Sequence, residues 1–170
     1  LQVPLVPRMS FREPRGSDAV RAFADSLGSR FVVVNPGGRL GHRRVPVSVF
    51  QAAVKQLKQR GVTPVVTWGP GEEALARDVA LEVGTVAPPT SLDDLAFLMK
   101  QSVQVVCNNT GPMHLSVAVG ARTLALFFRM PITRWGHTQA PHVMLDLTPW
   151  AADESQMQQQ VIQQLESLGR

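Results

Sequence analysis

The segment from Val105 to His114 holds the residues best suited to binding chemistry. Its apolar start predicts a buried strand that stops at two asparagines and turns directly into a helix. Thr110 is a good N-cap, because its hydroxyl can accept a bond from a helix N–H, and Pro112 suits the first turn. Gly111 lets a ligand approach the backbone closely, and His114 adds a side-chain donor. Unpaired N–H groups and the positive end of the helix dipole favour phosphate here, although a well-capped junction without a ligand explains the same residues.

Further loops carry residues of the same kind. Residues 35–38 (Asn-Pro-Gly-Gly) end the first predicted strand, and residues 68–72 (Trp-Gly-Pro-Gly-Glu) end the next. Residues 39–44 contain three arginines and a histidine, and residues 88–90 precede another helix. Glycines accommodate a ligand against the backbone, arginines supply cations and Glu72 can accept hydrogen bonds from ribose hydroxyls. Taken singly, these residues are equally explained by turn chemistry, by acidic residues at a helix start and by solvated surface arginines.

Strands and helices alternate along the chain. The predicted strands are continuous apolar runs, as in a sheet covered on both faces. They span residues 31–34, 64–68, 85–87, 103–107, 123–127 and 143–147. The predicted helices span 18–27, 71–83, 112–119 and 153–168, with one from a capping box of Ser48 and Gln51 to Gly61 and one from Ser91 to Lys100. This order predicts an α/β fold, a Rossmann-like, doubly wound and mainly parallel sheet with helices on both faces. In such a sheet, ligands bind at the carboxyl ends of the strands near a topological switch point.

Composition narrows the functional classes. The chain has 170 residues, 44% of them hydrophobic, and a formal net charge of +4. No apolar run is long enough to span a membrane, and the single Cys107 reads as a small core residue. The positive charge is thinly spread without interleaved aromatic residues, so we expect no nucleic-acid partner. The four histidines are scattered without metal-ligand spacing, so we expect no metal requirement and no cofactor.

The domain organisation is expected to be simple. Residues 1–16, rich in proline and arginine, predict a linker or N-terminal segment, and residues 17–170 predict one Rossmann-like domain. The chain begins with Leu1 and this linker-like stretch, which suggests a piece of a longer protein.

Four motifs occur in a recognisable order. They are the Asn-Pro-Gly loop, Trp-Gly-Pro-Gly-Glu, Thr-Ser-Leu-Asp-Asp-Leu-Ala and Asn-Thr-Gly-Pro-Met-His-Leu. Over residues 31–136 the chain resembles the C-terminal half of the ADP-heptose:lipopolysaccharide heptosyltransferases, inverting glycosyltransferases of the GT-B type. The resemblance implies that the sugar nucleotide, an ADP-heptose, is held on this domain. It also implies that the catalytic base and the site for a lipid-linked glycan acceptor lie on an N-terminal domain outside this chain. The implied location is cytoplasmic, with peripheral contact to the inner membrane as an open alternative.

The resemblance also implies a set of donor contacts. Arg43 stands where the family has a lysine that reaches the phosphates, and Glu72 matches the acid that binds the ribose. Thr90 lies in the loop beside the adenine. The turn that binds the diphosphate is matched by Thr110, Gly111 and His114.

Several positions depart from the family pattern. Asn109 replaces the acid that touches the donor sugar, Gly38 and Arg39 stand where small or hydroxyl residues are common, and Val45 replaces a tryptophan. Phe128 replaces a glycine, and a side chain of this size could close the sugar side of the pocket. The departures at Asn109 and Phe128 leave open a non-catalytic nucleotide-binding or assembly module. A dinucleotide-dependent oxidoreductase is disfavoured, because Gly-x-Gly-x-x-Gly does not follow the first strand.

Overall fold

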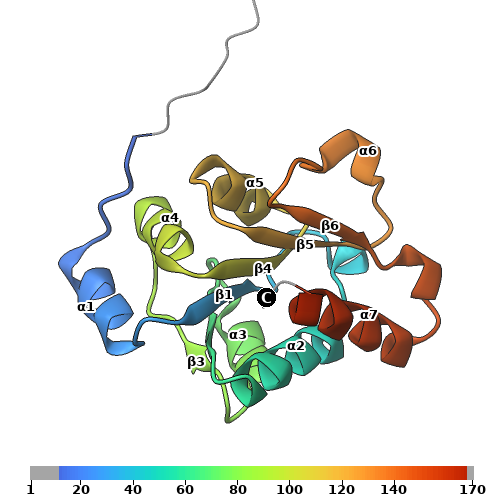
Figure 1. Ribbon diagram of the computed structural model, residues 1–170, viewed down its shortest axis with the longest axis horizontal. Helices are drawn as coiled ribbons and strands as arrows, with labels where there is room; N and C mark the ends of the chain where they lie inside the picture. Colours follow the sequence, from blue (N-terminus) through green and yellow to red (C-terminus); the bar gives the residue numbers. More distant parts are fainter. Residues whose placement is uncertain (1–11, 168–170) are drawn as a thin grey trace, which may run out of the picture.

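The chain folds around one fully parallel sheet (Figure 1). The computed structural model describes residues 12–167. In chain order the strands are β1 (Phe31–Asn35), β2 (Thr63–Val66), β3 (Thr85–Val86), β4 (Gln104–Asn108), β5 (Thr123–Phe127) and β6 (Val143–Asp146). They lie in the order β3-β2-β1-β4-β5-β6 and pair in parallel throughout. The predicted α/β, doubly wound architecture is therefore confirmed.

Helices cover both faces of this sheet. They are α1 (Asp18–Ser26), α2 (Val47–Gln59), α3 (Glu73–Ala80), α4 (Leu92–Gln101), α5 (Gly111–Ala118), α6 (Ile132–Trp135) and α7 (Glu154–Ser167). Two short 3-10 turns, η1 (Gly41–Arg43) and η2 (Thr148–Trp150), lie in the connections. Figure 1 shows α2, α3 and α7 on one side of the sheet and α4 and α5 on the other.

The apolar runs explain this arrangement, because successive side chains of a strand point to opposite faces. In β1, Val32 and Val34 join the core beneath α2, α3 and α7, whereas Phe31 and Val33 join the core beneath α1, α4 and α5. All five residues of β1 are buried. A strand that is buried on both faces needs no polar alternation, which is why its sequence reads as a continuous apolar run.

The strand order reverses between β1 and β4. The chain leaves β1 for α2, which packs on one face, and leaves β4 for α5, which packs on the other. The two connections therefore diverge and leave a crevice at the carboxyl ends of these strands, as expected of a doubly wound sheet.

Two helix starts differ from prediction. The capping box at Ser48 is wrong, because α2 begins after Pro46 without a side-chain cap, the Ser48 hydroxyl bonds Glu154 and the Gln51 amide bonds the Asp78 carbonyl. Helix α3 is shorter than the predicted 71–83, with Gly71 before it and Leu81 after it both at positive φ.

The helix start at Ser91 is as predicted. Its hydroxyl accepts from the Asp94 N–H at 3.1 Å, and the Asp94 carboxylate accepts from the Ser91 N–H at 3.1 Å, which completes a capping box. Among the described residues, no helix is long and apolar enough to cross a membrane.

Candidate functional site at the switch point

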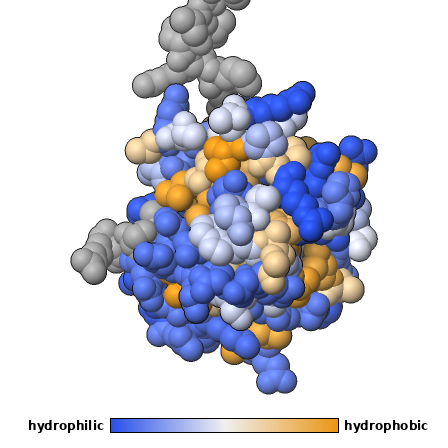
Figure 2. Space-filling model, turned by 90° about the vertical axis from the view of Figure 1, so that its right-hand side faces the viewer, coloured by the Kyte–Doolittle hydropathy of each residue, from blue (hydrophilic) through white to orange (hydrophobic). Residues whose placement is uncertain are grey.

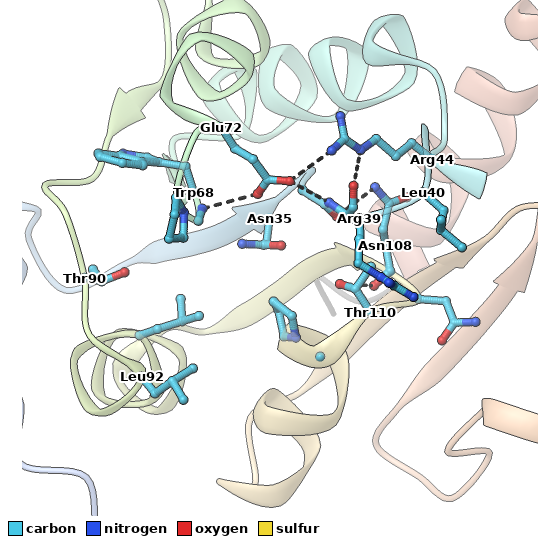
Figure 3. Close-up of a pocket in the computed structure, with 18 of the residues that line it drawn as sticks. Asn35, Arg39, Leu40, Arg44, Trp68, Glu72, Thr90, Leu92, Asn108 and Thr110 are labelled. Carbon is cyan, nitrogen blue, oxygen red and sulfur yellow. Dashed lines mark hydrogen bonds and ion pairs between the residues drawn. The ribbon is translucent and has the colours of Figure 1, made fainter. Parts of the chain in front are cut away.

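A pocket of about 610 Å³ opens in the crevice between β1 and β4 (Figure 3). Its walls come from the loops that follow β1, β2 and β4 and from the start of α4. The lining residues are Asn35, Gly37, Gly38, Arg39, Leu40, Arg43, Arg44, Trp68, Gly69, Pro70, Glu72, Thr90, Ser91, Leu92, Leu95, Asn108, Asn109, Thr110, Gly111 and Pro112. Eight of the nine predicted site residues are in this set, and His114 is not.

The start of α5 lies at the floor of this pocket. Thr110 is at the N-cap position in an extended conformation, as predicted, but the predicted cap bond is wrong. Its hydroxyl donates to the Asn108 carbonyl at 3.4 Å and accepts from no helix N–H. Within residues 12–167, no acceptor is found for the backbone N–H groups of Thr110 and Gly111. These donors, with the positive end of the helix dipole, are suited to an anion.

Asn108 is a positioning residue that sequence reasoning missed. Its side chain is buried, and its amide donates to the carbonyls of Pro36 at 2.7 Å and Gly37 at 3.4 Å. Its carbonyl accepts from the Val45 N–H at 3.2 Å. One side chain at the end of β4 therefore fixes both ends of the loop that follows β1. The only signal in the sequence is an asparagine at the last position of an apolar strand, where a buried polar group must find partners.

Glu72 fixes the same loop from the other side. Its carboxylate accepts from the N–H groups of Gly38 at 2.9 Å and Gly69 at 3.3 Å, and it pairs with Arg44 at 3.1 Å (Figure 3). A Cβ on Gly37 would lie 2.2 Å from the carboxylate oxygen Oε2. The glycine is therefore required by the close approach of Glu72.

Positive charge dominates the pocket wall. Three arginines and one carboxylate are among the lining residues, and Arg44 is paired with Glu72. Arg39 and Arg43 are exposed, and neither has a carboxylate partner within 4.0 Å in the described part of the chain. Their guanidinium groups are therefore available to an anionic ligand.

The opposite end of the pocket is apolar. Trp68 is held by a bond from its indole N–H to the Ala87 carbonyl at 2.8 Å, and Leu92 lines the pocket with 77% of its surface exposed. Thr90 lies between them on the rim (Figure 3). A flat apolar ring with polar edges would fit this end of the pocket.

His114 lies outside the pocket. Its Nδ1 is 2.8 Å from Nε2 of His137, and the two rings meet edge to face. Partial burial, and secondarily the charge of His137, lower the pKa of His114 below its ordinary value. The same two causes lower the pKa of His142. Within residues 12–167, no group of three or more potential metal ligands is assembled.

Phe128 does not close the pocket, which settles the possibility left open by its size. Its side chain is 8% exposed and joins the core beneath α2 and α7, and it does not line the pocket. The larger side chain is accommodated because it turns into the core. Cys107 is a core residue, as predicted, and burial raises the pKa of its thiol to about 12.

One side of the molecule has a surface of mixed polarity. Figure 2 shows the side of the molecule that is at the right of Figure 1, with hydrophilic residues over most of it and hydrophobic side chains in patches between them. Fold and pocket together define a doubly wound α/β domain with a cationic pocket at the switch point.

The comparisons identify the family. The sequence model of glycosyltransferase family 9 (heptosyltransferase) matches residues 3–165, and the chain therefore belongs to this family. A comparison with curated proteins finds no significant match.

Solved structures share this fold. A glycosyltransferase of family 9 from Veillonella parvula superposes with a TM-score of 0.73 and 21% identity, covering 91% of this chain and 52% of that one. E. coli heptosyltransferase WaaC with ADP gives 0.74 and 20%, covering 88% and 48%. E. coli ADP-heptose lps heptosyltransferase II gives 0.71 and 18%, covering 99% and 55%. The chain thus spans about half the length of these structures.

Proposed function

We propose that this chain is the donor-binding domain of an inverting heptosyltransferase and that its pocket holds the diphosphate of ADP-heptose. The observation that carries the proposal is that two backbone N–H groups at the start of α5 find no acceptor among residues 12–167. They share a pocket with the guanidinium groups of Arg39 and Arg43, which have no carboxylate partner in the same part of the chain. Backbone donors, a helix dipole and cations together suit a diphosphate. The family and the ADP in the E. coli WaaC structure support the choice of nucleotide.

The proposed reaction transfers the sugar with inversion. An acceptor hydroxyl oxygen bonds to the anomeric carbon while the bond from that carbon to the phosphate oxygen breaks, and ADP leaves with the electron pair. A base in the other half of the full-length protein takes the acceptor proton. In this domain, Arg43 and the Thr110 and Gly111 N–H groups would stabilise the charge that develops on the leaving diphosphate. Because arginine supplies the positive charge, we propose no metal and no cofactor.

The apolar end of the pocket would hold the adenine. Trp68 and Leu92 offer apolar surface, and Thr90 offers a hydroxyl at the rim. Glu72 is already engaged with two backbone N–H groups and Arg44, so a ribose hydroxyl would have to share its oxygens. Asn109, on the wall of the pocket, would contact the sugar through an amide.

The family supports a proposal for the acceptor and the location. We propose a lipid-linked glycan of the lipopolysaccharide core as acceptor and the cytoplasm as the location, with peripheral contact to the cytoplasmic face of the inner membrane. Nucleic acid is not a proposed partner.

The experiment isolates the Gly111 N–H. Calorimetric titration with ADP compares Gly111→Pro, which removes the N–H at a helix position that tolerates proline, with Gly111→Ala, which keeps it. A Cβ at this position meets no protein atom within 4 Å. Hydrogen bonds to charged groups contribute about 1.5–3 kcal/mol, so the proline variant should bind roughly 10- to 100-fold more weakly than the alanine variant. Equal affinities of the two variants would contradict the proposed diphosphate position.

Arginine variants and other nucleotides complete the test. Arg43→Ala should weaken ADP binding at least fivefold, whereas Arg77→Ala, an exposed arginine of α3 paired with Glu73, should leave it within twofold. ADP and ADP-heptose should bind more tightly than UDP-sugars or NAD. Preference for NAD would favour an oxidoreductase.

A non-catalytic module is the second candidate, favoured by the amide of Asn109 where an acid is expected. The packing of Phe128 in the core no longer supports it. Binding of ADP without any gain from the attached heptose would favour this candidate.

A further inference from the structure

Carboxylates at the start of α4 hold the segment that leads into α1. The backbone N–H groups of Arg15 and Gly16 donate to Oδ2 of Asp93 at 3.1 and 2.9 Å. The N–H of Ser17 donates to Oδ1 of Asp94 at 2.6 Å. Earlier in the same segment, Glu13 pairs with Lys100 near the other end of α4. We call residues 13–17 the strap.

Asp94 connects this strap to the pocket. While Oδ1 accepts from the strap, Oδ2 accepts from the backbone N–H of Ser91 at 3.1 Å and from its hydroxyl at 2.7 Å. Ser91 and Leu92 line the apolar end of the pocket. Asp94 itself is 8% exposed, and its two carboxylate oxygens are engaged by these protein donors. One buried carboxylate thus bonds the strap through one oxygen and the pocket rim through the other.

Gly16 seats the strap against α4. It has a φ of +63°, and a Cβ at this position would lie 2.8 Å from Cγ of Phe97 on the same helix. Its carbonyl accepts from the Arg21 guanidinium at 2.7 Å. The strap therefore has one close-packed position, and a side chain at Gly16 would lift it from α4.

We propose that Asp94 is a positioning residue that couples the seating of the strap to occupancy of the pocket. This inference rests on the proposed function, because a nucleotide that contacts Ser91 and Leu92 would hold the start of α4 in the geometry the strap requires. The coupling is reciprocal by thermodynamic necessity: the factor by which a seated strap improves binding equals the factor by which bound nucleotide stabilises the seated strap. The segment that enters this domain thereby senses the state of the pocket.

The test displaces the strap by a substitution within it, away from the pocket. Gly16→Ala is compared with Gly61→Ala, which has the same positive-φ strain (+70°) at the end of α2 but meets no atom within 4 Å. We expect Gly16→Ala to speed hydrogen exchange at residues 15–17 at least tenfold and to weaken ADP binding three- to tenfold. Gly61→Ala should change both less than twofold. In the unchanged protein, saturating ADP should slow hydrogen exchange at residues 15–17. The factor of this slowing should equal the factor by which Gly16→Ala weakens ADP binding.

The outcomes separate this inference from the proposed function. If ADP binds but exchange of the strap is the same with and without it, the coupling is refuted. If ADP does not bind at all, the proposed function fails, and the coupling is then judged from NMR of the free protein. Gly16→Ala should change the NMR chemical shifts of Ser91 and of the Trp68 indole. If these changes are no larger than in Gly61→Ala, the inference is overturned. Should Gly16→Ala fail to fold, Asp93→Ala removes the strap's acceptor and repeats the comparison.

Discussion

Replacing Asn108 by alanine tests whether this side chain holds the pocket together. The change removes two well-formed hydrogen bonds, to the Pro36 carbonyl at 2.7 Å and from the Val45 N–H at 3.2 Å. Both partners are buried residues and would lose their bonding partner away from water. Each unsatisfied buried group costs about 1–3 kcal/mol, so we expect the free energy of unfolding to fall by roughly 2–5 kcal/mol. A domain of ordinary stability, about 5–15 kcal/mol, would remain largely folded.

Urea unfolding followed by circular dichroism measures this loss as a lower midpoint at an unchanged slope. The matched control is Asn109→Ala, the next residue, whose side chain is partly exposed and has no hydrogen bond to the described residues. A surface change of that kind should cost about 0.5 kcal/mol or less. If the two variants unfold within 0.5 kcal/mol of each other, the bonds of Asn108 do not stabilise the pocket.

Asn108→Asp adds a pH dependence to the same site. A carboxylate would face the Pro36 carbonyl, so the aspartate should have a raised pKa in the folded state and donate from its protonated form. A group whose pKa is higher in the folded than in the unfolded state stabilises the fold at pH values below its unfolded pKa. This stability is lost as the pH rises through its folded-state pKa. We expect this variant to be more stable than Asn108→Ala at pH 4 and to lose the advantage toward neutral pH. A constant difference would contradict the expected repulsion.

Three further predictions concern titrating groups. Burial alone would raise the pKa of Asp94, but hydrogen bonds from the strap and from the capping serine outweigh it and lower the pKa from 3.8 to about 2. The stability linked to this shift is about 2 kcal/mol, and it should be complete above pH 4 and be lost as the pH falls toward 2. Urea unfolding of Asp94→Asn and of the unchanged protein at these two pH values measures it. Equal urea midpoints of the two proteins at both pH values would refute the prediction. The lowered pKa of His114 stabilises the fold above the ordinary pKa of 6.5, and this contribution is lost as the pH falls. In His137→Ala, an NMR titration should find a higher pKa for His114 than in the unchanged protein. An unchanged pKa would contradict the effect assigned to the charge of His137. The buried Cys107 should react with a thiol reagent at pH 8 only after denaturant is added, and rapid reaction of the native protein would contradict its burial.

The sequence was sufficient to predict the elements and their layers. Strand β1 is apolar at every position but the last, and the middle of β4 is apolar as well; only a sheet covered on both faces buries such runs. The start of α4 was equally readable, because Ser91 and Asp94 bond each other three residues apart. Errors fell where a distant partner competes with a local one. Ser48 bonds Glu154 instead of the end of its own helix.

For the candidate site, the sequence likewise predicted some features and missed others. Eight of its residues could be named from sequence, because the carboxyl ends of parallel strands share one edge and the unusual residues follow those ends. The roles of particular side chains were less accessible. Glu72 was predicted to bind ribose, and the structure adds its bonds to Gly38, Gly69 and Arg44. His114 was placed on the correct helix turn, but its side chain bonds His137 outside the pocket.

Local patterning, then, determined which segments became strands and helices and which edge of the sheet carries the glycines and cations. Tertiary structure alone decided that Asn108 holds the loop after β1, that Phe128 turns into the core and that Asp94 joins the strap to the rim of the pocket. The physical reason is the range of the interactions. Periodicity and capping act between residues a few positions apart. The bonds of Asn108 to Pro36 and of Asp94 to Ser17 link residues 72 and 77 positions apart, whose meeting depends on how the whole sheet is assembled.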